Sequence, residues 1–210
     1  MPQPLLPLAL ALMIGTGLAT ATLADVPGQL ADYPVIVDTD PPREGPLVLN
    51  GCTLAPGAVC PGVDLRHADL RGIKLNGADL RGAILTRANF FGAELRGADL
   101  SGADLRGADL SMTQAQGIKL REARMTGANL DYARLSGADL SGADLTAATL
   151  EAVMAPKARF VGATLVSANM MEAKFYNADF AEAHLEGNHA PYAIWEGVHM
   201  ENCTGCPVDW

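Results

Sequence analysis

The sequence has few of the residues from which catalytic and metal sites are built. Its 210 residues include only four cysteines and four histidines. Cys203 and Cys206 form a C-x-x-C motif, but no second such motif or histidine pair accompanies them to complete a zinc site. No arrangement of nucleophile, base and acid is recognisable either. The sequence therefore predicts a protein without enzymatic activity, cofactor or metal.

Charged side chains are absent from residues 1–24. Leu5 to Leu18 is mostly apolar, and small residues follow as far as Ala24. This pattern is typical of a secretory signal peptide cut after Ala21 or Ala24, so we expect a periplasmic or secreted protein. An uncleaved membrane anchor is the alternative, because residues 4–24 are just long enough to span a bilayer. No other segment has that length and hydropathy, so no membrane span is expected in the mature form.

A repeat of five residues occupies most of the sequence. Between positions 61 and 205 there are 29 such units, and 25 of them end in Leu, Phe, Met or Trp. Two residues before that large residue, 21 of the 29 units have alanine, and two residues after it glycine is common. A period of five fits neither the α-helix nor the flat strand, so it indicates a repeat architecture.

The spacing within a unit predicts its local structure. Residues two apart in extended backbone point to the same side, so Ala98 and Leu100 face one way and Asp99 the other. The chain must then turn, and glycine adopts the positive φ of a type II turn at little cost. Short sides separated by turns can close into a square whose interior is filled by alternating large and small side chains.

The repeat resembles that of the pentapeptide repeat family, whose motif is Ala-(Asp/Asn)-Leu-x-x. Ala98-Asp99-Leu100, Ala103-Asp104-Leu105 and Ala138-Asp139-Leu140 match it fully. The resemblance covers about 61–205 and implies an all-β fold, a right-handed quadrilateral parallel β-helix with 20 residues per coil. The 29 units then make about seven coils. Coils at strand spacing would give a rod roughly 35 Å long. Where Ala115 and Ala155 replace the large residue, we expect local repacking and no gap.

The expected organisation is a signal peptide (1–24), a Pro-rich segment and cap (25–60), the β-helix (61–200) and a C-terminal cap or tail (201–210). Within the second part, 46–60 is the expected cap, and Tyr33 to Val37 is the one strand-like run. At the other end Trp195, Met200 and Trp210 are candidates to cover the last coil, which should be wider and less regular. All four cysteines lie in these end regions, which suggests two disulfides in an exported chain. The rod is too long for a bridge between its ends, so we expect Cys52–Cys60 and Cys203–Cys206.

Stacking at 20 residues predicts columns of polar side chains, which include Asp79 beside Asp99 and a second set of Asp69, Asn89, Asp109 and Asn129. Paired carboxylates can bind a cation or act as acid and base. The resemblance instead implies that they bond the neighbouring backbone at turns. His67, His184, His189 and His199 fall on different sides or distant coils, so no metal cluster is expected.

A possible partner patch consists of Phe91, Met112 and Tyr132, which should point outward near one corner of three successive coils. Met171 and Tyr192 continue it as a broken stripe. A contiguous exposed apolar patch often marks a partner site. We therefore expect contact with an unidentified protein or envelope partner, or a homodimer, and no nucleic acid ligand.

Three functions are compatible with these features. The first is an exported, non-enzymatic scaffold or protein-binding rod. The second follows from the resemblance, because some pentapeptide repeat proteins imitate duplex DNA and bind DNA gyrase, and the net charge of −9 fits such a role. The basic stretch between Arg66 and Arg124 and the expected export count against it. The third is thiol–disulfide activity at Cys203 and Cys206.

Overall fold

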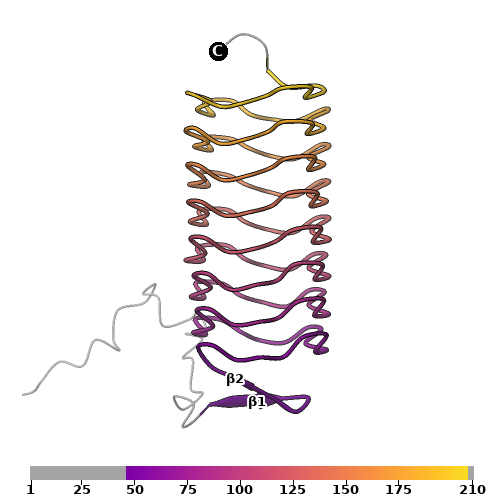
Figure 1. Ribbon diagram of the computed structural model, residues 1–210, viewed down its shortest axis with the longest axis vertical. Coiled ribbons are helices and arrows are strands. Elements are labelled where there is room, and N and C mark those ends of the chain that lie inside the picture. The colour runs from indigo at the N-terminus through magenta and orange to yellow at the C-terminus, as the bar shows by residue number, and fades with distance from the viewer. Residues whose placement is uncertain (1–45, 208–210) are drawn as a thin grey trace, which may run out of the picture. The chain divides into compact units, whose positions relative to one another are not determined.

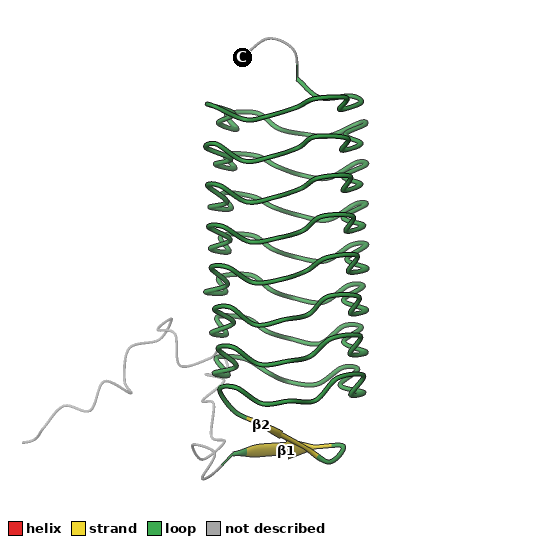
Figure 2. Ribbon diagram, in the orientation of Figure 1, coloured by secondary structure: helices red, strands yellow, loops and turns green. Residues whose placement is uncertain are grey.

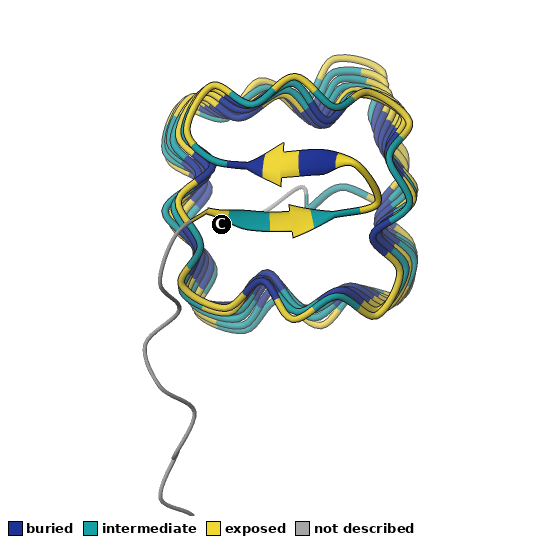
Figure 3. Ribbon diagram, turned by 90° about the horizontal axis from the view of Figure 1, so that it is seen from below, coloured by how far each residue is buried: buried dark blue, intermediate teal, exposed yellow. Residues whose placement is uncertain are grey.

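The computed structural model of the protein describes residues 46–207 (Figure 1). Parallel β-bridges join residues 20 positions apart, in a series that runs from Val59–Asp79 to His184–Thr204. Each bridge connects two neighbouring coils, so four five-residue units complete one turn. Seen along its axis, this part of the chain is a stack of four-sided coils (Figure 3). The predicted quadrilateral β-helix is therefore confirmed in its coil length and cross-section.

The inward positions are the ones predicted from the spacing. Leu80, Ala98 and Leu100 have no exposed surface, and the same holds for nearly all residues at the two inward positions of each unit between 75 and 180. Backbone bonds such as the one from the Leu100 amide to the Lys119 carbonyl, 2.8 Å long, link each coil to the next. The interior is thus a continuous column of apolar side chains inside a ladder of parallel bonds.

The corners of the coils carry the predicted positive φ angles, but glycine is not required there. Fourteen corner residues other than glycine, from His67 to Asn202, also lie in this region, with φ between 51° and 61°. A side chain in the left-handed conformation costs of the order of 1–2 kcal/mol. The stacked coils stabilise the corner geometry enough to sustain that cost.

Repacking without a gap is what the structure shows where the large residue is missing. Ala115 and Ala155 have no exposed surface, and neither do the enlarged partners Thr113 and Val153 two residues before them. The Thr113 hydroxyl donates a hydrogen bond of 2.8 Å to the Leu110 carbonyl, so its polar atom is satisfied inside the core. The bridges continue through both places.

A short hairpin covers the N-terminal end of the coils. Strand β1 (Leu47–Leu49) pairs antiparallel with β2 (Cys52–Leu54), and both are the yellow arrows of Figure 2. The hairpin lies across the square opening when the coils are seen from that end (Figure 3), and Cys52 and Leu54 are each 3% exposed. The expected cap at 46–60 is thus a hairpin that closes over the apolar column.

The C-terminal end is filled by aromatic rings. Trp195 lies inside the column with its ring 4.7 Å from Phe175 and 5.5 Å from Phe180, centroid to centroid. Met200 is only partly buried against this cluster. Gly205, at φ 69°, passes so close to the Leu185 carbonyl oxygen that no side chain would fit there.

Several predictions fall outside the described residues. These are the signal peptide at 1–24, the segment 25–45 with its strand-like run from Tyr33 to Val37, and the covering role of Trp210. Within 46–207 the structure contains no helix that is long and apolar enough to cross a membrane.

Candidate functional site

The candidate partner residues lie at one corner of three successive coils. The Gly92 amide, next to Phe91, bonds the Ser111 carbonyl, and the Met112 amide bonds the Asp131 carbonyl next to Tyr132, at 3.0 and 2.9 Å. These bonds hold the three positions in register at strand spacing, about 4.8 Å per coil. Phe91, Met112 and Tyr132, which we call the apolar patch, are 45%, 53% and 52% exposed.

Of the two residues predicted to continue the patch as a broken stripe, only Tyr192 is highly exposed. Tyr192 is 83% exposed at the same corner, where the Glu172 amide bonds the carbonyl of its neighbour Pro191 at 3.0 Å. Met171 is only partly exposed. The patch and Tyr192 are therefore separated by two coils whose corner residues are Glu151, Ala152, Met171 and Glu172.

Acidic side chains adjoin the patch on its C-terminal side. The Tyr132 hydroxyl donates a hydrogen bond of 3.1 Å to the Glu151 carboxylate of the next coil. This bond raises the pKa of Tyr132, and the negative charges of Glu151, Glu172 and Asp131 raise it further. The phenol therefore stays protonated at neutral pH, and the patch carries negative charge beside its apolar groups.

The polar columns form as predicted, with bridges from Asp79 to Asp99 and along Asp69, Asn89, Asp109 and Asn129. Their side chains bond the backbone two residues later. Asp99 accepts the Ser101 amide at 3.1 Å, and Asn129 accepts the Asp131 amide at 2.9 Å. This is the structural role implied by the resemblance, because each bond satisfies a backbone donor at a turn.

Ion pairs within one coil are a feature that the sequence analysis missed. Arg66, Arg81 and Arg106 each bond the aspartate two residues earlier through Nε and Nη2, at distances between 2.6 and 3.1 Å. The arginine bond is the main cause that lowers the pKa of Asp64, Asp79 and Asp104. The repeated Asp-Leu-Arg triplet is the signal that could have predicted them.

The histidines are separated as expected, and within 46–207 no group of three potential ligands could hold a metal ion. His184 Nδ1 lies 2.6 Å from the Thr204 hydroxyl, and His199 Nδ1 lies 2.9 Å from the Asp179 carboxylate. These contacts link neighbouring coils at the C-terminal end.

Both cysteine pairs are joined in the structure. Cys52 bonds Cys60 with their Cα atoms 5.9 Å apart, and Cys203 bonds Cys206 with a Cα separation of 5.8 Å. The first bridge ties the hairpin to the start of the β-helix. The second bridge closes the short loop between Cys203 and Cys206. A structural cap and a redox-active pair would both have this bridge, so thiol–disulfide activity stays a hypothesis.

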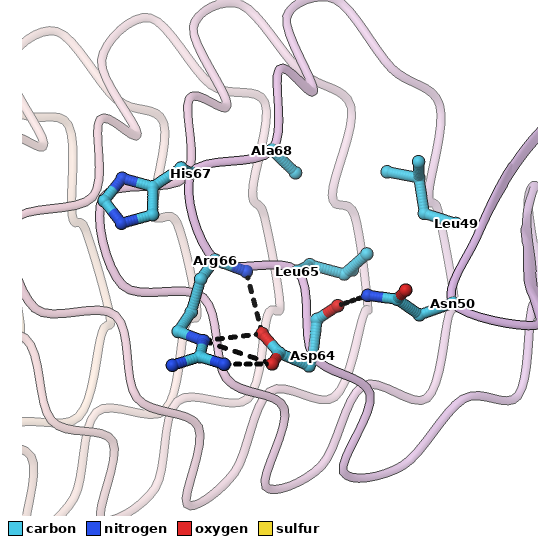
Figure 4. Close-up of a pocket in the computed structure, with 7 residues that line it drawn as sticks. All are labelled: Leu49, Asn50, Asp64, Leu65, Arg66, His67 and Ala68. Carbon is cyan, nitrogen blue, oxygen red and sulfur yellow. Dashed lines mark hydrogen bonds and ion pairs between the residues drawn. The ribbon is translucent and has the colours of Figure 1, made fainter.

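A surface hollow of about 440 Å³ separates the hairpin turn from the first coil, and Figure 4 shows the residues that line it. The side-chain amide of Asn50 donates a hydrogen bond to the Asp64 carbonyl, while Arg66 pairs with the Asp64 carboxylate. The side chains of Arg66 and His67 extend away from Asn50 (Figure 4). This hollow was not predicted.

The sequence profile described as pentapeptide repeats matches the chain in eight copies, over residues 49–82, 83–121, 113–146 and 157–187. No curated protein sequence matches the chain.

Among solved structures, QnrB1, a plasmid-mediated fluoroquinolone resistance protein, is 22% identical, with 70% of this chain and 79% of that one covered and a TM-score of 0.39. HetL, a pentapeptide repeat protein involved in heterocyst differentiation regulation in Nostoc sp. strain PCC 7120, is 27% identical, with coverages of 69% and 85% and a TM-score of 0.23. A pentapeptide repeat protein of the Arabidopsis thaliana thylakoid lumen is 32% identical over 44% of this chain and 64% of its own, with a TM-score of 0.24.

Proposed function

The chain belongs to the pentapeptide repeat family, and from that premise we propose that it is an exported, non-enzymatic rod that binds a protein partner along one corner of its coils. The uncharged, apolar stretch at residues 1–24 supports the export. The right-handed winding, which the family implies, and the length of about seven coils, which follows from 29 units at four units per coil, are also part of the proposal.

The apolar patch is the observation that carries this function. Most large apolar side chains of the coils are buried inside the column, and exposed ones such as Ile84 and Met154 stand singly on other sides. Phe91, Met112 and Tyr132 are about half exposed and lie together at one corner of three successive coils. They stand on successive coils of a stiff backbone ladder, so they would lose little conformational freedom of the main chain on binding. Contiguous exposed apolar groups of this kind are typical of partner sites.

The charges beside the patch indicate the chemistry of the partner. Glu151 and Glu172 adjoin Tyr132, with Asp131 directly before it. A partner segment that combines apolar side chains with lysine or arginine would match both the apolar and the negative groups. A cation over the Tyr132 ring adds about 0.5–1 kcal/mol at an exposed site.

A photocrosslinking residue at position 112 of the mature protein, expressed in its native cell envelope, tests this function. We expect a crosslinked protein whose contact segment, mapped by mass spectrometry, contains lysine or arginine next to apolar residues. The Phe91→Ser and Tyr132→Ser double variant should keep the circular dichroism spectrum of the parent protein and lose the crosslink.

Position 122 gives the matched control. Glu122 is also an exposed corner residue with positive φ, but it lies on the opposite corner of the coils. Equal crosslinking from 112 and 122, or a crosslink that survives the double variant, would overturn the proposal. A crosslink to a second copy of the chain would show self-association and would contradict the basic partner.

The ion pairs weaken the alternative of DNA mimicry. The carboxylates of Asp64, Asp79 and Asp104 each face an arginine of the same coil, so this half of the surface does not present the unbroken negative charge of a phosphate backbone. Inhibition of gyrase supercoiling by the purified protein would revive that function.

A further inference from the structure

A second surface hollow, of about 380 Å³, lies at a different corner and is lined almost entirely by cationic or hydrogen-bonding side chains. Its lining residues are Arg66, His67, Thr86, Arg87 and Arg106. The His67 amide bonds the Thr86 carbonyl at 3.0 Å, and the Arg87 amide bonds the Arg106 carbonyl at 3.0 Å. The lining therefore comes from three successive coils held in register.

Two of the three arginines are oriented by aspartates. Arg66 and Arg106 donate hydrogen bonds from Nε and Nη2 to the carboxylates of Asp64 and Asp104. These bonds fix the planes of both guanidinium groups and leave Nη1 outside the pairs. Such bidentate pairs carry no net charge, but they hold their arginines in a defined geometry.

The third arginine provides charge that these aspartates do not neutralise. Within residues 46–207, Arg87 forms no hydrogen bond or ion pair through its side chain. It extends over the next coil, where its Cγ lies 3.5 Å from the place that a Cβ on Gly107 would occupy. Arg124, 3.6 Å from Asp104, adds another cation to the same side. Arg124 also acts on the Asp144 carboxylate, so this part of the coils has four arginines and three carboxylates, an excess of one positive charge.

We propose that this hollow binds a ligand with two or more phosphate groups. Arg66 and Arg106 stand two coils apart, about 10 Å along the axis at strand spacing, with Arg87 on the coil between them. Planar guanidinium groups match phosphate oxygens, and the Thr86 hydroxyl is a further donor beside them. A single phosphate would reach only part of this row, whereas an oligophosphate or the clustered headgroups of an anionic lipid would reach all of it.

Isothermal titration calorimetry of the mature protein with tripolyphosphate and with orthophosphate tests the site at low ionic strength. We expect tripolyphosphate to bind at least tenfold more tightly than orthophosphate. Arg87→Gln should lower the affinity for tripolyphosphate at least fivefold. Arg134→Gln, which removes an exposed arginine from another part of the coils, should change the affinity less than twofold. Matching melting temperatures would show that both variants are folded.

Cosedimentation with vesicles that contain phosphatidylglycerol distinguishes the two sources of phosphate. Vesicle binding that Arg87→Gln reduces would support a lipid headgroup, while tripolyphosphate binding without vesicle binding would support a soluble ligand. The proposal is overturned if neither probe binds at millimolar concentration, or if Arg134→Gln weakens binding as much as Arg87→Gln does.

Discussion

The Nε of Arg121 donates a hydrogen bond of 2.6 Å to the carboxylate of Asp139, which stands on the next coil. The same carboxylate accepts the Ser141 amide at 3.1 Å and the Ser141 hydroxyl at 2.6 Å. Burial alone would raise the pKa of Asp139, but the bonds from Ser141 and Arg121 outweigh it and lower the pKa. The Asp139 side chain thus accepts the backbone donor of a turn and also connects two neighbouring coils.

Asp139→Ala should lower the free energy of unfolding by about 1–3 kcal/mol, because the Ser141 amide loses its acceptor in a mostly buried place. Arg121→Ala should cost less than 1 kcal/mol, since that arginine is largely exposed and its loss leaves the turn bonds intact. Urea unfolding of the two variants measures the difference. Equal losses would show that the connection between coils matters as much as the turn.

The regular part of this fold could be predicted from the sequence because every five-residue unit has the same two inward apolar positions followed by a turn. The inward placement of Ala98 and Leu100, the coil length and the column from Asp69 to Asn129 all follow from a spacing of five. The Asp-Leu-Arg ion pairs were not predicted, although the repeated triplet places an arginine two residues after each aspartate; the triplet gives the proximity, but the bidentate geometry depends on the arginine rotamer.

The hairpin shows a local signal that was present and not used. Asn50 and Gly51 have φ angles of 47° and 76°, which is the conformation of a type I′ turn. Asn-Gly between two short apolar runs is the strongest short-range signal for a hairpin. The hollow beside the hairpin turn, by contrast, requires the placement of Asn50 against residues 64–68 of the first coil, which no local pattern gives.

Leu100→Ala should destabilise the protein by about 2–5 kcal/mol, because the side chain is fully buried in a column that cannot collapse. The chain already contains a compensating arrangement. Where Ala115 and Ala155 replace the large residue, the larger Thr113 and Val153 replace the usual alanine two positions earlier. The double variant Ala98→Val, Leu100→Ala should therefore recover part of the loss. Urea midpoints compare the two, and a double variant less stable than the single one would contradict compensation within a unit.

Tyr132→Gly should be more stable than Tyr132→Ala by about 1 kcal/mol. Both variants lose the ring and its bond to Glu151, but alanine keeps a Cβ at φ 60° whereas glycine adopts this conformation freely. The extra freedom of glycine in the unfolded chain offsets part of the gain. Thermal melting of the pair measures the difference, and an equal or lower melting temperature for the glycine variant would show that the corner is not strained.

Replacing Cys52 and Cys60 by serine should lower stability by about 2–3 kcal/mol, the loop-closure value for a bridge across eight residues. The loss should concentrate at the hairpin, so amide exchange at Leu54 should become faster than at Leu100. The matching double variant at Cys203 and Cys206 closes a much shorter loop and should cost less. A larger effect from the second pair would indicate that the C-terminal end limits stability.

His199 should titrate above its ordinary pKa of about 6.5. The hydrogen bond to the Asp179 carboxylate is the main cause that raises this pKa, burial opposes it, and the charges of Asp179 and Glu201 add to the rise. Because the folded pKa is higher than the unfolded one, the stabilisation is fully present below about pH 6.5 and is lost as the pH rises through the folded value. His199→Gln should therefore lower the melting temperature more at pH 5.5 than at pH 8.5. Proton NMR of the imidazole gives the pKa directly, and Asp179→Asn should return it toward the ordinary value. A folded pKa at or below 6.5 in the parent protein would show that Asp179 does not hold the charged form.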